Sequence, residues 1–387
     1  MIYLLIAILI LVAVLHFEVL NREKGKIFYM FLLYIVFVLL YGFRFRIGGD
    51  SLSYEESYPF MPTFKDITRY GLYYREYLYA FQPLWLILIA IAKSIGKEFY
   101  YFQFLHAIII NGIIMVYLMK YSSKPFSVLF LLYILHYYFY LTIEIEREIL
   151  AVGVFLFNIK NLVNRKWLPY YLLCFLSFLF HISAIILFLL PLLVIFKISY
   201  KNMIIIMIAC SPLIFLKEFF LTLIKPLLFM ELMEKKVEHY NEIEFSILGI
   251  LLNYFTRVLC IIPLYYYYYK KENSEDKMWL FNGILIISVL CLGLVGFERF
   301  LNYLIIPYVC LFVEFIYSIK FEKNKIFVYS MVGLLSFINI GSNIPVRLLT
   351  KNSKGTPYYS LFFPYVTIFE KKIIYDREKY MIENWSE

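Results

Sequence analysis

A short stretch, residues 44–54, combines residue types that suit phosphate binding and proton transfer. Arg44 and Arg46 leave the end of an apolar block, two glycines that permit a tight backbone follow, and Asp50 comes next. A guanidinium group can bind a phosphate through two hydrogen bonds, and a carboxylate can accept a proton from a hydroxyl group. The alternative is structural: an anchor at the membrane interface with a turn and a local arginine–aspartate pair.

Two further stretches place polar side chains at the edge of apolar blocks. Residues 144–151 form a dense charge cluster with Arg147, although Glu144, three residues earlier, could simply pair with it on one helical face. Residues 180–184 place His181 in the middle of an apolar run. This imidazole is either a titratable group for proton transfer or a packed, hydrogen-bonded histidine.

The fourth polar stretch, residues 298–303, opens an apolar block with Arg299 and, four residues later on the same helical face, Tyr303. An aromatic anchor at the membrane interface is the alternative here. A charge at membrane depth costs at least about 2.5–3.5 kcal/mol, so such side chains usually face a wet cavity or a partner. Four separate stretches therefore point to a polar site.

The apolar blocks that carry these stretches indicate the class of protein. Of the 387 residues, 63% are hydrophobic and 17% are charged, and the mean hydropathy is +0.75. Soluble proteins have about a quarter charged residues. The apolar blocks run for 15 to 30 residues without a formal charge, long enough to cross a hydrocarbon layer of about 30 Å. A soluble enzyme, a secreted disulfide scaffold and a disordered chain are excluded.

We predict an all-α, polytopic integral membrane protein with about 12–13 transmembrane helices, some short or re-entrant, and small extracytoplasmic loops. A single transmembrane domain is expected over 1–387. The predicted spans are 2–20, 27–43, 81–95, 99–119, 126–143, 147–163, 167–180, 182–196, 202–216, 246–269, 278–296, 300–317 and 326–341. Three segments remain outside the membrane: an extracytoplasmic loop at 44–80, an amphipathic extracytoplasmic segment at 217–245, and a C-terminal tail at 342–387.

Orientation follows from the count of Lys and Arg, because basic connections tend to be cytoplasmic. The basic connections contain Arg22/Lys24/Lys26, Arg165/Lys166, Lys197/Lys201, Lys270/Lys271/Lys277 and Lys320/Lys323/Lys325. This orientation predicts that five polar residues lie on the extracytoplasmic side: Arg46, Asp50, Arg147, His181 and Arg299. Arginines on the extracytoplasmic side are contrary to the rule that basic residues favour the cytoplasmic side. Binding of an anionic lipid head group, especially a pyrophosphate, would explain their presence.

Two stretches are expected to depart from a simple span. An even number of crossings is needed between Asp50 and Arg147, yet three apolar blocks lie there, so 81–98 is expected to dip into the membrane and return. The block Trp167–Phe196 has 30 residues without a formal charge, and as one helix it would measure about 45 Å. Two short helices meeting at His181 are expected, and one long tilted helix is the alternative.

The other features favour no metal, cofactor or nucleic-acid site. The net charge of +9 comes from short basic clusters between apolar blocks, as in the loops of membrane proteins. The first block begins at Ile2 without a basic segment or a cleavage site, so it is expected to be a retained span. The five cysteines lie in apolar blocks without a CxxC pair and are expected to be packing residues: Cys174, Cys210, Cys260, Cys291 and Cys310.

Taken in order, the four polar stretches resemble the motifs of the EpsG family, a Wzy-like group of bacterial polysaccharide polymerases. The matching motifs are R-x-x-G-D-x-x-x-Y at Arg46–Tyr54, R-x-x-L-A at Arg147–Ala151, F-H-x-S-A at Phe180–Ala184 and R-F-x-x-Y-x-x-x-P at Arg299–Pro307, followed by a Pro357-Tyr-Tyr tail. One departure is Glu148, since members of the family usually carry Gln after the mid-chain arginine. The glycine pair before Asp50 is a slight variation.

The resemblance implies a glycosyltransferase that joins undecaprenyl-pyrophosphate-linked oligosaccharide repeat units into exopolysaccharide, capsule or O-antigen. It would act at the outer face of the bacterial cytoplasmic membrane, without nucleotide sugar, ATP, cofactor or metal. Fixed cations would neutralise the leaving pyrophosphate, and a base would take the proton of the acceptor hydroxyl. The expected catalytic residues are Asp50, His181, Arg147 and Arg299, with His181 preferred over Asp50 as the base. The expected substrate-binding residues are Arg44, Arg46, Gly49, Tyr54, Ser183 and Tyr303.

The expected partners are the lipid-linked oligosaccharide, membrane lipids, and a chain-length regulator and a flippase of the same pathway. Nucleic acid is not expected. Two alternatives stay open. One is a GT-C-type glycosyltransferase that uses a polyprenyl-phosphate sugar, because such enzymes usually carry an acidic residue in the first outer loop, where Asp50 lies. The other is a lipid-linked oligosaccharide flippase, although the paired repeats typical of transporters are absent from the sequence.

Overall fold

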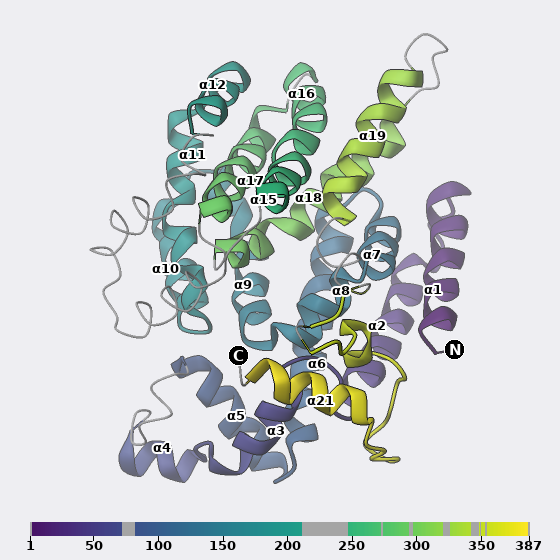
Figure 1. Ribbon diagram of the computed structural model, residues 1–387, viewed down its shortest axis with the longest axis vertical. Coiled ribbons are helices and arrows are strands. Elements are labelled where there is room, and N and C mark those ends of the chain that lie inside the picture. Colours follow the sequence, from purple (N-terminus) through teal and green to yellow (C-terminus); the bar gives the residue numbers. More distant parts are fainter. Residues whose placement is uncertain are drawn as a thin grey trace. The chain divides into compact units, whose positions relative to one another are not determined.

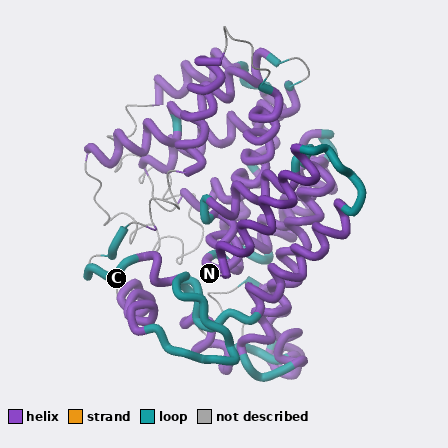
Figure 2. Tube along the Cα trace, turned by 90° about the vertical axis from the view of Figure 1, so that its right-hand side faces the viewer, coloured by secondary structure: helices purple, strands orange, loops and turns teal. Residues whose placement is uncertain are grey.

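The computed structural model describes residues 2–71, 82–210, 247–271, 274–293, 297–319, 326–341, 348, 350–352 and 354–385. Helices make up the regular structure of these ranges, which contain two isolated β-bridges and no strand (Figure 2). The predicted all-α fold is confirmed. The predicted segment 217–245 lies outside the described residues, as do residues 72–80 of the predicted loop and 342–347 of the predicted tail.

The chain divides into two compact units, which are described separately. Unit 1 consists of Met1–Phe157, Phe175–Ile182 and Asn343–Glu387, and unit 2 consists of Asn158–Cys174 and Ser183–Ser342. Three helical elements contribute residues to both units: α9 (Glu146–Val163), α10 (Trp167–Phe178) and the 3₁₀ helix η5 (Ile182–Phe188).

Unit 1 is a group of apolar helices with short helices in its loop and tail (Figure 1). Its elements, with 3₁₀ and π turns labelled η, are α1 (Ile2–Ala13), η1 (Val14–Val19), α2 (Lys26–Gly42), α3 (Ser51–Ser57), η2 (Tyr58–Phe60), α4 (Phe64–Tyr70), α5 (Pro83–Ile95), α6 (Phe99–Tyr121), α7 (Pro125–Ile134), α8 (Tyr137–Phe139), η4 (Tyr140–Glu144), η10 (Tyr358–Leu361) and α21 (Tyr375–Trp385). Helix α2 packs along α6, α1 packs on α7, and α5 packs on α6.

Unit 2 is built around α17, which packs against α11, α12, α15, α16 and α18. Helix α19 packs against α16 and α18. The bounds of its elements are η5 (Ile182–Phe188), α11 (Leu190–Phe196), α12 (Tyr200–Cys210), α15 (Ile247–Arg257), η8 (Leu259–Ile261), α16 (Ile262–Lys270), α17 (Glu275–Gly293), α18 (Glu298–Ser318) and α19 (Ile326–Gly341).

Three helical segments among the described residues are long and apolar enough to cross a membrane: Ile2–Val19, Phe99–Tyr121 and Glu298–Ser318. The pair Pro125–Ile134 and Tyr137–Glu144 would add a fourth if it is one span, although it bends by 87°. The bend lies at His136, whose left-handed φ of 64° interrupts the helix. Several other apolar helices have 10–17 residues, among them α2, α5 and α12, so the count of 12–13 spans stays a prediction.

The long apolar block around His181 is broken into two parts, as expected. Helix α10 ends at Phe178, a turn follows, and η5 begins at Ile182. One long helix is therefore excluded. Helix α5 has 13 residues, which corresponds to about 20 Å and is too short to cross a hydrocarbon layer of about 30 Å. Entry of residues 81–98 into the membrane stays a prediction.

Candidate functional site

Arg147 lies half-buried in the first turn of α9, and its side chain contacts the loop that follows α2. Its Nε donates a hydrogen bond of 3.0 Å to the hydroxyl of Tyr54, and its guanidinium carbon lies 6.0 Å from the centre of that ring. The first and second sequence motifs therefore meet in unit 1, although 93 positions separate the two residues. This contact was not predicted as a pair, but both residues were expected at the site.

Two aromatic rings pack against the ring of Tyr54 and fix the direction of its hydroxyl. Its ring lies 5.5 Å from that of the fully buried Trp85 in α5 and 6.5 Å from that of Phe99 at the start of α6. Burial raises the pKa of Tyr54 above its ordinary value, although Arg147 lowers it. The phenol is therefore protonated near neutral pH, so it can accept from Arg147 and donate to a bound oxygen.

His181 and Glu148 are brought together in unit 1, with Nδ1 of the imidazole 4.0 Å from Oε2 of the carboxylate. Both are almost fully buried, with 4% and 2% of their surfaces exposed. The turn at the end of α10 holds the histidine, because the amide of His181 donates to the carbonyl of Ser177 at 3.1 Å. The hydroxyl of Ser177 in turn donates to the carbonyl of Ala151 in α9. The departure from the family pattern thus places an acidic group beside the histidine.

These contacts form two pairs, Tyr54 with Arg147 and Glu148 with His181, which are joined through adjacent residues of α9. The four residues are here called the Arg147 cluster. Three stretches of unit 1 contribute to it, and each carries one of the polar motifs found in the sequence. Asp50 lies one turn before Tyr54, whose amide donates to its carbonyl at 3.0 Å, and its side chain is exposed. The cluster combines a cation, a phenol and an imidazole–carboxylate pair, which suits anion stabilisation together with proton transfer.

Arg44 is fully buried and pairs with the buried carboxylate of Glu146. A second guanidinium nitrogen donates to the carbonyl of Tyr41, the next-to-last residue of α2. The pair ties the end of α2 to the start of α9, immediately before Arg147. Arg44 was predicted to bind substrate, and this stays a prediction; the structure shows its guanidinium paired with Glu146 and Tyr41.

Arg46 lies between two carboxylates. Its Nε donates to Glu55 of α3 at 2.7 Å, and its Nη1 donates to Glu378 of α21. Burial lowers the pKa of Arg46, but the hydrogen bonds to Glu55 and Glu378 outweigh it and raise the pKa overall. The residue is therefore a permanent cation whose charge is matched locally, although it was predicted to bind substrate.

The C-terminal tail forms part of the same region, with α21 beside α3 (Figure 1). Arg377 is buried, and it donates to the carbonyls of Ser360, Pro364 and Phe45. Burial lowers its pKa to about 10, so it remains charged at neutral pH. The hydrogen bond to Phe45 thereby joins the tail to the segment 44–54, which contains Tyr54.

An intrahelical pair between Glu144 and Arg147 was the plain alternative for the charge cluster. The two residues do not lie on one helix, because η4 ends at Glu144 and α9 begins after Ile145. Glu144 instead accepts a hydrogen bond of 2.6 Å from the hydroxyl of Tyr358 in the tail.

The glycine pair before Asp50 contains one position that requires glycine. Gly48 has φ of +105°, and a Cβ there would lie 2.3 Å from a side-chain carbon of Ile143. We expect Gly48→Ala to destabilise the protein by about 2 kcal/mol or more, through both backbone strain and overpacking. A lower unfolding midpoint of the purified protein in detergent is the measurement.

The neighbouring glycine supplies a matched control. A Cβ at Gly49 would meet only Leu361, at an ordinary 3.9 Å, so Gly49→Ala should leave stability unchanged within about 0.5 kcal/mol. Equal unfolding midpoints for both variants would contradict the assignment. Because Gly49 was predicted to bind substrate, a loss of activity in this stable variant would report on that contact.

Unit 2 holds the remaining predicted residues. The hydroxyls of Ser183 and Tyr303 lie 2.9 Å apart and are buried, so the third and fourth motifs also meet directly. Arg299, one turn before Tyr303 on α18, is exposed. The predicted site residues thus fall into two groups, one in each unit.

Sequence reasoning missed Arg257, which lies at the end of α15. Its Nη2 donates to Glu298 at 2.8 Å, and its side chain is almost fully buried. A signal was present, because Arg257 is the only formal charge in the predicted span 246–269. A charge at membrane depth marks a functional candidate by default. Glu378 and Glu55 were also missed, and no spacing marks them.

No group of three or more His, Cys, Asp or Glu side chains within the described ranges could hold a metal ion. The five cysteines are not joined in disulfides: Cys174, Cys210, Cys260, Cys291 and Cys310.

Comparison with protein families finds a match to the EpsG family over residues 27–367. This range includes all four polar motifs and every residue of the Arg147 cluster. No curated protein and no solved structure matches the chain.

Proposed function

The chain belongs to the EpsG family, and from this premise we propose that it is a Wzy-type polysaccharide polymerase. It joins undecaprenyl-pyrophosphate-linked oligosaccharide repeat units into exopolysaccharide, capsule or O-antigen. The observation that carries the proposal is the family match over residues 27–367, within which Arg147 contacts Tyr54 and the next residue, Glu148, lies beside His181.

The proposed reaction is a transfer between two lipid-linked sugars. The terminal sugar hydroxyl of an incoming unit attacks the anomeric carbon of the growing chain and forms a new glycosidic bond. The bond between that carbon and the pyrophosphate oxygen breaks, and undecaprenyl pyrophosphate leaves with the electron pair. The hydroxyl proton passes to a base. The site must therefore stabilise a developing anion and accept one proton.

Arg147 is the proposed stabiliser of the leaving pyrophosphate. Its Nε is occupied by Tyr54, which fixes the plane of the guanidinium, and a guanidinium fork suits bidentate contact with phosphate oxygens. The protonated Tyr54 can add a further hydrogen bond. Arg299, exposed on α18 of unit 2, is the proposed second cation.

His181 is the proposed base. Its buried position beside Glu148, at 4.0 Å, gives an imidazole with a carboxylate partner that stabilises the imidazolium formed when the proton arrives, as in other base–carboxylate pairs. Asp50 is exposed and is proposed to contact the acceptor sugar. Ser183 and Tyr303, hydrogen-bonded to each other in unit 2, are proposed to contact the substrate through their hydroxyls.

Arg44 and Arg46 are proposed to act as framework residues. Each is matched by carboxylates, Arg44 by Glu146, and Arg46 by Glu55 and Glu378. A phosphate would have to displace these partners. Their role is then to hold the start of α9 and the loop before Tyr54 in place.

The proposed location is the bacterial cytoplasmic membrane, with many passes and the Arg147 cluster on the outer side. The apolar helices support a membrane protein, and the basic connections between predicted spans support the orientation. The proposed partners are membrane lipids and the flippase and chain-length regulator of the same pathway.

We expect His181→Ala to lower polymerisation by about 10²–10⁴-fold, the usual contribution of a general base. Glu148→Gln should lower it less, by at least about fivefold, because opposite charges 4 Å apart gain about 1 kcal/mol even in water. Polymer length and amount on gels, normalised to protein level, are the measurement. The assignment of the base fails if His181→Ala makes polymer at the normal rate.

Deletion of the gene followed by lipid analysis tests the proposed function. Single repeat units on undecaprenyl pyrophosphate should accumulate in the outer leaflet, and a plasmid copy of the gene should restore polymer. Accumulation in the inner leaflet would instead indicate a flippase. Unchanged polymer, or accumulation of a polyprenyl monophosphate sugar, would also contradict the proposal.

A further inference from the structure

Unit 2 contains a cavity of about 710 Å³, within the range typical of small-molecule sites. Four chain segments line it: the connection after α9, the connection from α11 to α12, the end of α16 and the start of α17. In the sequence, the first three carry the basic clusters Arg165/Lys166, Lys197/Lys201 and Lys270/Lys271. The fold thus gathers three basic connections around one opening, which is here called the basic cavity.

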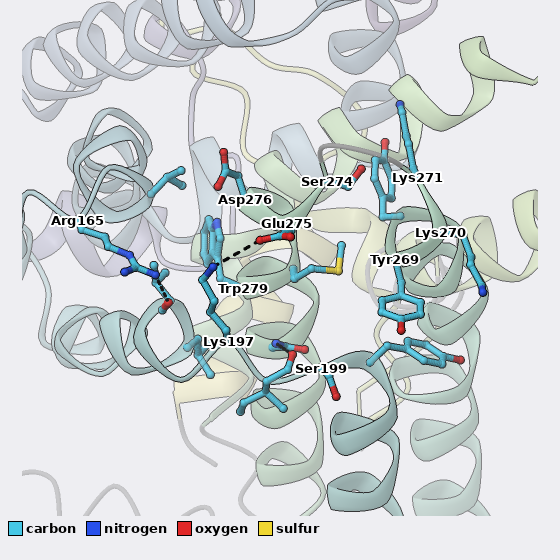
Figure 3. Close-up of a pocket in the computed structure, with 18 residues that line it drawn as sticks. Arg165, Lys197, Ser199, Tyr269, Lys270, Lys271, Ser274, Glu275, Asp276 and Trp279 are labelled. Atoms are coloured by element: carbon cyan, nitrogen blue, oxygen red, sulfur yellow. Dashed lines mark hydrogen bonds and ion pairs between the residues drawn. The ribbon is translucent and has the colours of Figure 1, made fainter.

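Four cations and two carboxylates line the basic cavity. Arg165 lies on one side, and Lys270 and Lys271 lie on the other (Figure 3). Lys197 lies 3.5 Å from Glu275, but both side chains are largely exposed, 66% and 86%, and such surface pairs are weak. The lining therefore has an excess of positive charge.

The cations are only partly matched by described carboxylates. The guanidinium of Arg165 donates to the carbonyl of Val194 at 3.3 Å, and Lys270 lies over the ring of Tyr269 at 5.9 Å. No carboxylate within the described ranges forms an ion pair with either side chain.

Lys271, which lines the basic cavity, shares its carboxylate partner with Lys277, which does not line it. Lys271 and Lys277 share the single carboxylate of Glu314, each at 2.9 Å. Two ammonium groups on one carboxylate leave one positive charge unmatched. A phosphate group would meet this excess.

The other lining residues are those of a membrane interface. Trp279 and Tyr269 line the basic cavity together with apolar side chains such as Leu193 and Met278. Tryptophan and tyrosine favour the level of lipid head groups. The apolar side chains of this lining can contact the glycerol and first acyl carbons of a lipid, which inorganic phosphate lacks.

We propose that the basic cavity binds the phosphate head group of an anionic phospholipid from the cytoplasmic leaflet. Arg165, Lys197 and Lys270 supply the positive charge that attracts the phosphate, while Leu193 and Met278 contact the start of the acyl chains. Its basic connections place this end of unit 2 on the cytoplasmic side, where anionic lipids attract clustered Lys and Arg. The proposal does not depend on the proposed polymerase activity.

Lipid binding to the full-length protein tests the proposal by native mass spectrometry in a neutral detergent. The probes are dioleoyl-phosphatidylglycerol and dioleoyl-phosphatidylcholine. The wild-type protein should bind the first at least about tenfold more tightly. The triple variant R165A/K197A/K270A should lose this preference, because each cation near an anionic lipid contributes about fivefold in affinity.

A matched triple variant, R22A/K24A/K160A, is the control. It removes three exposed cations that neither line the basic cavity nor belong to the three basic clusters around it, and it should bind phosphatidylglycerol within about twofold of the wild type. Equal losses in both triple variants would overturn the proposal, since they would show general charge attraction. Equal binding of the two lipids by the wild type would overturn it as well.

Two additions keep the outcome interpretable. The single variants Arg165→Ala and Lys270→Ala, both at exposed side chains, should each weaken binding about fivefold if the triple variant fails to fold. Inorganic phosphate at millimolar concentration should not displace the lipid. Its displacement of the lipid would show a site for free anions and contradict a lipid site.

Discussion

Replacing Arg147 with alanine should abolish polymer while the protein stays folded and in the membrane. Arg147 is half-buried and donates a hydrogen bond to Tyr54, so the orientation of its guanidinium group is fixed. Removal of one fixed donor from a developing anion costs about 10²–10³-fold in rate. The measurement is polymer made by a deletion strain that carries the variant, normalised to protein level.

Two controls separate charge from structure. Tyr54→Phe removes only the hydroxyl that Arg147 contacts, and a hydrogen bond to a charged group is worth about 1.5–3 kcal/mol, so its loss should be smaller. Arg22→Ala removes an exposed arginine from the connection between α1 and α2 and should leave polymer unchanged. Polymer of full length and normal amount from Arg147→Ala would remove this residue from the mechanism.

Replacing Arg44 with alanine should destabilise the protein by about 3–5 kcal/mol, because breaking a buried pair leaves an uncompensated charge. Arg44 and Glu146 are both fully buried, and the second carboxylate oxygen of Glu146 has no hydrogen-bond partner among the described residues. The carboxylate cannot reach water when its partner is lost. The unfolding midpoint of the purified variant in detergent is the measurement.

The double variant R44M/E146L decides whether the uncompensated charge is the cause. Apolar replacement of both partners is often neutral or stabilising, so this variant should be more stable than Arg44→Ala alone. The backbone carbonyl of Glu146, which contacts His106, is retained. A double variant no more stable than the single one would show that packing, rather than charge, explains the loss.

Hydropathy was sufficient to locate the helices, because every described apolar helix coincides with an apolar block of the sequence. It was not sufficient to show how the blocks bend. The left-handed backbone of His136 has no signature in composition, so the block 126–143 was predicted as one span. The break at His181 was predictable from length, since 30 apolar residues exceed one span.

The Arg147 cluster could be predicted in part from the order of the motifs. Arg147, Tyr54 and His181 were all expected, and they lie together in unit 1. Which arginines are paired could not be predicted. The partner of Arg46 on α21, Glu378, lies 332 positions away, and no periodicity links two residues at that distance. Glu148 was read as a departure from the family pattern, whereas its position suggests a partner for His181.

The measurement that tests the central claim most directly uses purified protein in liposomes with a synthetic undecaprenyl-pyrophosphate-linked repeat unit as the sole substrate. The wild-type protein should convert it into a ladder of longer lipid-linked chains and release one undecaprenyl pyrophosphate for each bond formed, without ATP or nucleotide sugar. Arg147→Ala should leave the substrate unchanged. Transport of the substrate without any ladder, or a ladder of equal yield from Arg147→Ala, would contradict the claim that the Arg147 cluster is a polymerase site.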